Sequence, residues 1–103
     1  MNIAIIAVLT IIAALATARI IYVCWFNSTL KKAQRAMRKA DFHEAMAEMA
    51  DDRIEAYERY AKARYAYRRA ARLYLKLGKR SSARFAVAKS VEMNKLYEKY
   101  LYM

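Results

Sequence analysis

The sequence predicts an all-α protein, in which a single N-terminal transmembrane helix is followed by an α-helical hairpin or a small helical bundle. Three observations predict this fold class. Residues 3–26 are apolar apart from Arg19, the chain contains one glycine and no proline, and the rest is rich in residues that favour helices. We therefore expect no β-sheet and two parts, a transmembrane anchor over residues 1–27 and a basic helical domain over residues 28–103.

The apolar segment is long enough to cross a bilayer. Its 24 residues would form a helix of about 36 Å, compared with a hydrocarbon core about 30 Å thick. Arg19 lies past the midpoint and costs about 2.5–3.5 kcal/mol, but the Ile, Leu, Val and Phe side chains together contribute about 4–7 kcal/mol, so insertion is favoured. Arg19 either extends towards the lipid headgroups or pairs with another subunit inside the membrane.

A secretory signal peptide is the alternative interpretation of this segment, because Ala16-Thr17-Ala18 has the small-x-small form of a cleavage site. The residues Met1-Asn2 carry no basic side chain, whereas signal peptides begin with a positively charged region. We therefore expect a retained membrane anchor.

Basic residues follow the apolar segment closely, and none precedes it. The positive-inside rule then predicts that the N-terminus lies outside and that the helical domain lies on the cytoplasmic side, or on the interior side of a virion. Aromatic residues are also common where a transmembrane helix leaves the bilayer. The residues expected at the membrane interface are Arg19, Tyr22, Trp25, Lys31 and Lys32.

The helical domain begins with a predicted helix over residues 30–39. This helix either starts at the good N-cap residues 27–29 or continues the membrane helix. Asp41 and Glu44 have the spacing of a capping box, which predicts a new helix start there. Asp51-Asp52 offers another start, so the pattern leaves open whether residues 30–77 form one helix or two.

The most regular periodicity lies between residues 60 and 77, where large and small apolar side chains recur every three or four residues. We expect Gly78 to end this helix, and Ser81 or Ser82 to cap a last helix that runs to about Tyr100. The two helices would pair as an antiparallel hairpin. The predicted helix-packing seam consists of Tyr60, Ala63, Tyr67, Ala70, Tyr74 and Leu77.

Residues 39–45 and 73–83 resemble the turns inside the helical hairpins of tetratricopeptide-type repeats. Ala45 and Ala83 are 38 residues apart in the sequence, whereas that family repeats about every 34 residues. The resemblance implies a helix-hairpin module that binds other molecules.

The formal net charge is +11, and the charges are segregated along the chain. Residues 59–89 contain no acid, so they would bind nucleic acid nonspecifically, contact anionic lipid, or form a solvated helix face. The tyrosines among them would either stack on bases or pack in the core. The candidate polyanion-binding residues are Arg64, Arg68, Arg69, Arg72, Lys76, Lys79, Arg80 and Arg84.

No catalytic pattern is present in the sequence. His43 and Cys24 are the only residues of their types and lie in different parts of the chain, and no glycine-rich phosphate loop occurs. We therefore expect no enzymatic activity, no metal and no cofactor.

The first hypothesis is a structural or accessory subunit of a larger membrane-associated assembly, with other protein subunits or further copies of itself as partners. The alternative is a membrane-anchored, nonspecific nucleic-acid-binding protein, such as a small virion membrane protein that tethers a genome.

Overall fold

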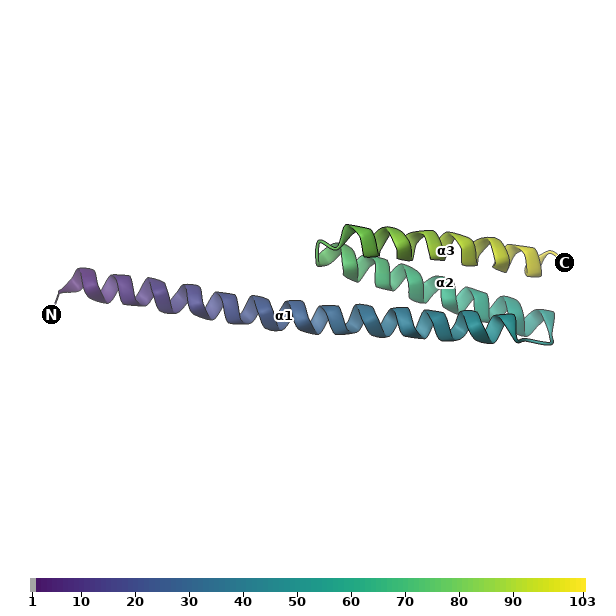
Figure 1. The fold of residues 1–103 in the computed structure, drawn as a ribbon, viewed down its shortest axis with the longest axis horizontal. Coiled ribbons are helices and arrows are strands. Elements are labelled where there is room, and N and C mark those ends of the chain that lie inside the picture. The colour runs from purple at the N-terminus through teal and green to yellow at the C-terminus, as the bar shows by residue number, and fades with distance from the viewer. Residues whose placement is uncertain (1) are drawn as a thin grey trace.

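The computed structural model describes residues 2–103, and this part of the chain forms three helices and no strand. They are α1 (Ile3–Glu48), α2 (Arg53–Lys76) and α3 (Arg80–Leu101). The predicted all-α fold is therefore confirmed. α2 runs antiparallel to α1 and lies between α1 and α3, packing against both, so that α2 and α3 form a helical hairpin laid along the second half of α1 (Figure 1).

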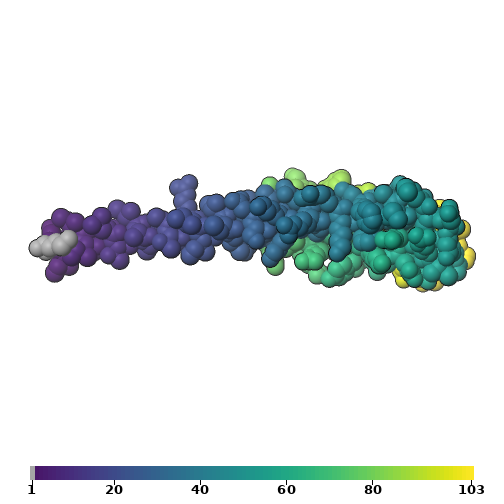
Figure 2. Space-filling model, turned by 90° about the horizontal axis from the view of Figure 1, so that it is seen from below, coloured from purple at the N-terminus to yellow at the C-terminus, as the bar shows by residue number. Residues whose placement is uncertain are grey.

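The molecule is a rod of 79 × 18 × 15 Å, because the N-terminal half of α1 extends beyond the other helices. Figure 2 shows this half as a single helix that leads into a thicker body. It is long and apolar enough to cross a membrane, and none of its most apolar window is buried. The hydroxyls of Thr10 and Thr17 donate to the carbonyl oxygens of Ile6 and Ala13 at 2.8 Å, so these polar groups have partners without water.

Alanine forms most of the core. On α1 the buried alanines Ala33, Ala36, Ala40 and Ala47 recur at helical spacing, so they share the face that meets α2. Such short side chains allow neighbouring helices to approach closely. Tyr67 is one of only two large side chains that are fully buried in residues 2–103, and the other is Met93.

α1 continues without a break from the apolar segment to Glu48, so residues 30–39 belong to the same helix as the apolar segment. The predicted helix start at Asp41 is wrong, as is the tetratricopeptide-like turn over residues 39–45. Asp41 and Glu44 do not cap a helix; their carboxylates accept hydrogen bonds from Tyr67 of α2. The preceding Ala40 is fully buried, so this stretch is held in the helix by packing.

The chain turns between α1 and α2 at residues 49–52, near the second start that the sequence offered. Asp52 is the N-cap of α2, and its carboxylate accepts a hydrogen bond from the backbone N–H of Ile54 at 3.2 Å. Residues 30–77 therefore form parts of two helices.

Gly78 ends α2, as the sequence predicts, and has a positive φ of 73°. The N–H of Gly78 donates to the carbonyl oxygen of Leu75 and that of Lys79 to the carbonyl oxygen of Tyr74, which together form a Schellman motif. The predicted capping by Ser81 or Ser82 is wrong. The chain reverses over residues 77–79, so α3 begins with Lys79 as its N-cap, without a side-chain cap, and both serines lie inside the first turn.

Candidate functional site

The predicted seam lies at the centre of the helical domain. Because α2 lies between two helices, the seam contacts both of them. The ring of Tyr60 stacks on that of Tyr100 in α3, with centroids 5.6 Å apart, whereas the hydroxyl of Tyr67 reaches α1. The buried members are Tyr60, Ala63, Tyr67 and Ala70, and the half-buried ones are Tyr74 and Leu77.

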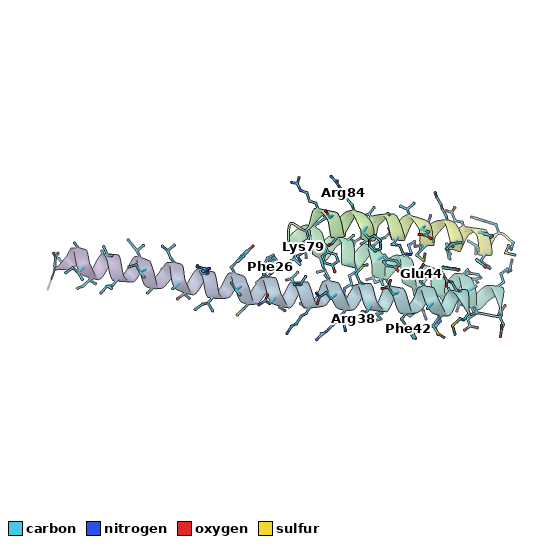
Figure 3. All side chains as sticks on the ribbon, in the orientation of Figure 1. Phe26, Arg38, Phe42, Glu44, Lys79 and Arg84 are labelled. Carbon is cyan, nitrogen blue, oxygen red and sulfur yellow. The ribbon has the colours of Figure 1, made fainter. Side chains whose placement is uncertain are left out.

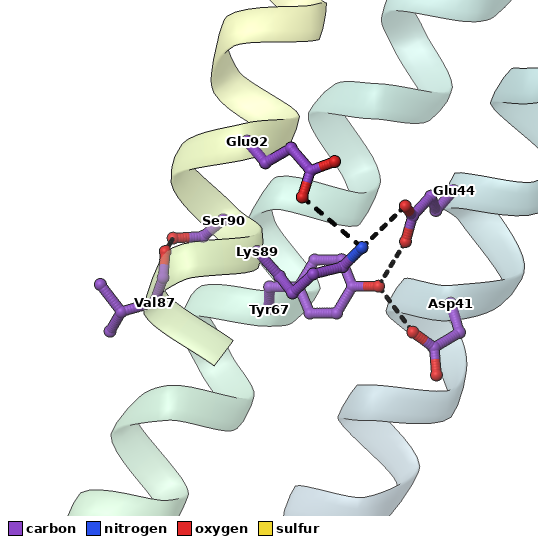
Figure 4. A network of polar contacts seen from close by, with 7 residues as sticks. All are labelled: Asp41, Glu44, Tyr67, Val87, Lys89, Ser90 and Glu92. Atoms are coloured by element: carbon purple, nitrogen blue, oxygen red, sulfur yellow. Dashed lines mark hydrogen bonds and ion pairs between the residues drawn. The ribbon is translucent and has the colours of Figure 1, made fainter. Parts of the chain in front are cut away.

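A polar network joins all three helices around the buried ring of Tyr67 (Figure 4). The Tyr67 hydroxyl lies 2.6 Å from both Asp41 Oδ1 and Glu44 Oε2, and since a phenol has one proton, it donates to one carboxylate at a time. Lys89 of α3 donates to Glu44 Oε1 at 2.8 Å, and its ammonium lies 3.8 Å from a carboxylate oxygen of Glu92. This network therefore connects α3 to α1 across α2.

The network shifts the pKa values of three groups. Burial raises the pKa of Glu44, but the hydrogen bonds from Lys89 and Tyr67 outweigh it, so this pKa lies below its usual value. Burial, followed by the hydrogen bonds to Asp41 and Glu44, raises the pKa of Tyr67 far above its ordinary value. The hydrogen bond to Glu44 raises the pKa of Lys89. At neutral pH the phenol of Tyr67 is therefore neutral, whereas Glu44 and Lys89 are charged.

Arg64, a predicted polyanion-binding residue, is held by contacts inside the helical domain. Its guanidinium donates to Asn94 Oδ1 at 2.6 Å and lies 4.9 Å from the ring centroid of Tyr97. The other seven predicted polyanion-binding residues are all exposed. The structure therefore separates Arg64 from the rest of that set.

Folding divides the charges of the helical domain between two halves. We call residues 28–40 and 66–90, which lie next to the apolar segment, the proximal half, and residues 41–65 and 91–103 the distal half. All nine acidic residues belong to the distal half, together with six basic ones. The thirteen basic residues of the proximal half are Lys31, Lys32, Arg35, Arg38, Lys39, Arg68, Arg69, Arg72, Lys76, Lys79, Arg80, Arg84 and Lys89.

The turn between α2 and α3 forms the tip of the proximal half. Figure 3 shows Lys79, in this turn, at nearly the same position along the rod as Phe26, the last residue of the apolar segment. Arg84, just beyond the turn on α3, points outward, and Arg38 points outward from α1. Cations from two separate parts of the sequence, residues 31–39 and 68–89, thus lie in the half of the domain nearest the apolar segment.

The predicted interface residues lie on exposed surfaces of α1. Arg19, Tyr22, Trp25, Lys31 and Lys32 are all exposed. The ring of Tyr22 lies 6.0 Å from that of Trp25, centroid to centroid, so two aromatic side chains occupy adjacent positions on the helix surface. The lysines follow about one to two turns later.

A groove with a volume of about 520 Å³ lies between α1 and α2. The ring nitrogen Nδ1 of His43 lies 3.2 Å from a guanidinium nitrogen of Arg59. Burial and then the positive charges of Arg59, Lys62 and Lys39 lower the pKa of His43, so this imidazole is neutral at neutral pH. The groove is lined by Ala36, Lys39, His43, Ala61, Lys62, Tyr65, Ala66 and Arg69.

Sequence reasoning did not group these residues, because the two walls are far apart in the chain. The available signal was helical spacing within each wall, since residues 36, 39 and 43 share one helix face and residues 62, 65, 66 and 69 share another. Only the antiparallel packing of α2 on α1 brings these two faces together.

No protein-family model, curated protein or solved structure matches the chain.

Residues 2–103 present no cluster of side chains that could hold a metal ion, since no group of three His, Cys, Asp or Glu side chains is arranged to do so. The single histidine faces cations instead of carboxylates. What the geometry offers is a dense set of cations, one basic groove and several exposed apolar side chains.

Proposed function

We propose that the protein is a non-enzymatic, single-pass membrane protein that acts as a structural or accessory subunit of a membrane-associated assembly. Its N-terminus lies outside, and its helical domain stands on the cytoplasmic side with the proximal half against anionic lipid headgroups. One observation carries this proposal: the half of the helical domain nearest the exposed apolar segment contains thirteen cations and no acid.

Electrostatics support the lipid contact. Each Lys or Arg near an anionic bilayer surface contributes about 1 kcal/mol, and the effect falls off within about 10 Å. Lys79 lies level with Phe26, and Lys31 and Lys32 follow within two helical turns, so several cations would fall inside this range. The mutual repulsion of these cations would be relieved by negative headgroups.

Exposed apolar side chains support a contact with other proteins. Phe85, Val87 and Val91 of α3 are each about half exposed, and Leu75 of α2 is 59% exposed. None of these side chains belongs to the core or to the apolar segment. Copies of this chain in one membrane would all point the same way, so their basic halves would lie at the same height and repel. The proposed protein partners are therefore other subunits that cover these exposed apolar side chains.

A vesicle experiment tests the lipid contact. The full chain is reconstituted in phosphatidylcholine bilayers with and without phosphatidylserine, and its thermal unfolding is followed by circular dichroism. We expect a higher Tm with phosphatidylserine, and a much smaller difference for the double variant Lys79→Gln, Arg80→Gln. The control, Lys95→Gln with Lys99→Gln, removes the same charge from the distal half and should keep the full difference. An equal loss in both variants would count against the proposal.

Native extraction tests the subunit role. A large particle that contains only protein and survives high salt is expected if another subunit covers the exposed apolar side chains of α2 and α3. Nucleic acid that co-purifies at low salt and dissociates steeply with rising salt would instead favour genome tethering. The structure gives that alternative one supporting observation, the exposed ring of Tyr65 in the basic groove, since Tyr67 is buried and Tyr74 is half-buried.

A further inference from the structure

We infer that the groove between α1 and α2 binds a nucleotide unit, meaning a phosphate group attached to a planar base. Lys39, Lys62 and Arg69 would hold the phosphate, and Tyr65 would stack on the base. The unit is either a free nucleotide or part of a single strand. The groove includes Lys39 and Arg69 of the proximal half. The inference does not depend on the lipid contact proposed above, because it is tested in a bilayer without net charge.

The positive charge of the groove favours an anionic ligand. Its three cations come from both walls, Lys39 from α1 and Lys62 and Arg69 from α2, and no acid lines it. Within residues 2–103, none of the three has a carboxylate within 4 Å. Cations held together without a counter-ion repel, so a bound phosphate relieves this repulsion and also receives charge-assisted hydrogen bonds.

The apolar and aromatic lining of the groove favours a ligand that contains a planar ring. Methyl groups of Ala36, Ala61 and Ala66 give it an apolar surface, and Tyr65 contributes an aromatic ring that is 67% exposed. Exposed aromatic rings beside cations are the usual platform for stacked bases. The volume of about 520 Å³ lies within the range of small-molecule sites, about 300–1,000 Å³.

The distance of the groove from the apolar segment excludes an ordinary phospholipid headgroup as the source of the phosphate. Ala36, the lining residue closest to the apolar segment, is ten residues beyond Phe26, or about 15 Å along the helix. The headgroup layer on each side of a bilayer is only about 5–8 Å thick. The ligand therefore comes from the aqueous phase.

The single histidine allows a direct test. His43 lines the groove, so its imidazole resonances in NMR spectra of the full chain report on the site. In phosphatidylcholine nanodiscs, which carry no net charge, we expect ADP to shift these resonances saturably and to raise the pKa of His43, because a nearby anion favours the imidazolium. Pyrophosphate should bind more weakly than ADP. If pyrophosphate binds as tightly as ADP, or if no probe shifts His43, the inference is overturned.

Matched variants locate the site. Lys62→Gln with Arg69→Gln should weaken ADP binding about tenfold or more, and Tyr65→Ala should reduce it to the level of pyrophosphate. The control, Lys95→Gln with Lys99→Gln, removes the same charge outside the groove and should leave the affinity unchanged. An equal loss in the control would show that general charge attracts the ligand, and this would overturn the inference. Oligothymidylate binding more tightly than ADP would identify a single strand as the source, and the reverse would identify a free nucleotide.

Discussion

The proximal and distal halves of the helical domain share the same helices and the same alanine-rich core, yet they differ in charge. In the distal half, nine acids and six bases lie close together, and tyrosines of α2 and α3 pack against each other, as Tyr57 does on Tyr97 at 5.9 Å between centroids. The proximal half contains thirteen bases and no acid. An alanine core leaves the outer faces of the helices free to vary, so one scaffold can carry two different surfaces.

The difference matters because like charges repel within a folded domain. The distal half reduces this repulsion with its own acids. In the proximal half Lys89 pairs with Glu44 and Glu92, and the other cations depend on solvent, salt or a bound polyanion. The network around Tyr67 lies at the boundary between the halves and joins them. The following predictions test this boundary and the two halves that it separates.

The largest effect is expected from Tyr67→Ala. This ring is fully buried between all three helices, and removing it leaves a cavity at the boundary and deletes the hydrogen bonds to Asp41 and Glu44. The free energy of unfolding, measured with urea and circular dichroism, should fall by about 3–5 kcal/mol. Tyr65→Ala is the matched control, since Tyr65 lies on the same helix but is 67% exposed, and it should change stability by less than about 0.5 kcal/mol. Similar losses of unfolding free energy in both variants would contradict the burial of Tyr67 between the three helices.

The variant Tyr67→Phe separates the hydrogen bonds from the packing. It keeps the ring but removes the proton that Asp41 and Glu44 share. A loss of about 1.5–3 kcal/mol is expected, because the deleted hydrogen bonds involve charged acceptors. Tyr65→Phe should have no measurable effect in the same urea titration. A neutral result for Tyr67→Phe would mean that packing alone joins the halves.

The variant Gly78→Ala acts on the tip of the proximal half. The residue has a φ of +73°, and an added Cβ would meet no atom within 4 Å, so the expected loss comes from backbone strain alone. We expect a loss of about 1–2 kcal/mol in the thermal unfolding of the full chain. Lys79→Ala is the control, since Lys79 has a negative φ and makes no side-chain cap. It should cost less than about 0.5 kcal/mol.

The smallest predicted effect is a change in how stability depends on pH in acid. The folded-state pKa of Glu44 lies below its usual 4.5, so the stability contributed by its ionised form is present above pH 4.5. This contribution is lost as the pH falls through the folded-state pKa. Part of the acid sensitivity of the wild-type Tm should therefore be absent in Glu44→Gln, whereas Glu92→Gln, at an exposed carboxylate, should retain it. Identical pH profiles for wild type and Glu44→Gln would contradict this assignment.

Much of the fold could be predicted, because it depends on neighbours in the sequence. Gly78 adopts the positive φ that ends α2, and Asp52 caps the start of that helix, both through contacts within a few residues. The helical spacing from Tyr60 to Ala70 likewise marks a face that is buried. The failures came where distant residues compete for the same groups. Asp41 and Glu44 have the right spacing for a capping box, but the hydroxyl of Tyr67 occupies their carboxylates inside a continuous helix.

The sequence by itself determined that residues 2–103 would be helical, that one segment would be apolar enough to cross a membrane, and that the chain would turn at Gly78. These properties follow from composition, local spacing and backbone freedom. Only the tertiary structure decided which charges share a surface. In the folded domain Arg64 contacts Asn94, and His43 and Lys62 line one groove. The acid-free parts of the three helices lie together in the half nearest the apolar segment. The physical reason is that antiparallel packing joins residues 16 to 50 positions apart, and periodicity within one helix carries no information about its neighbour.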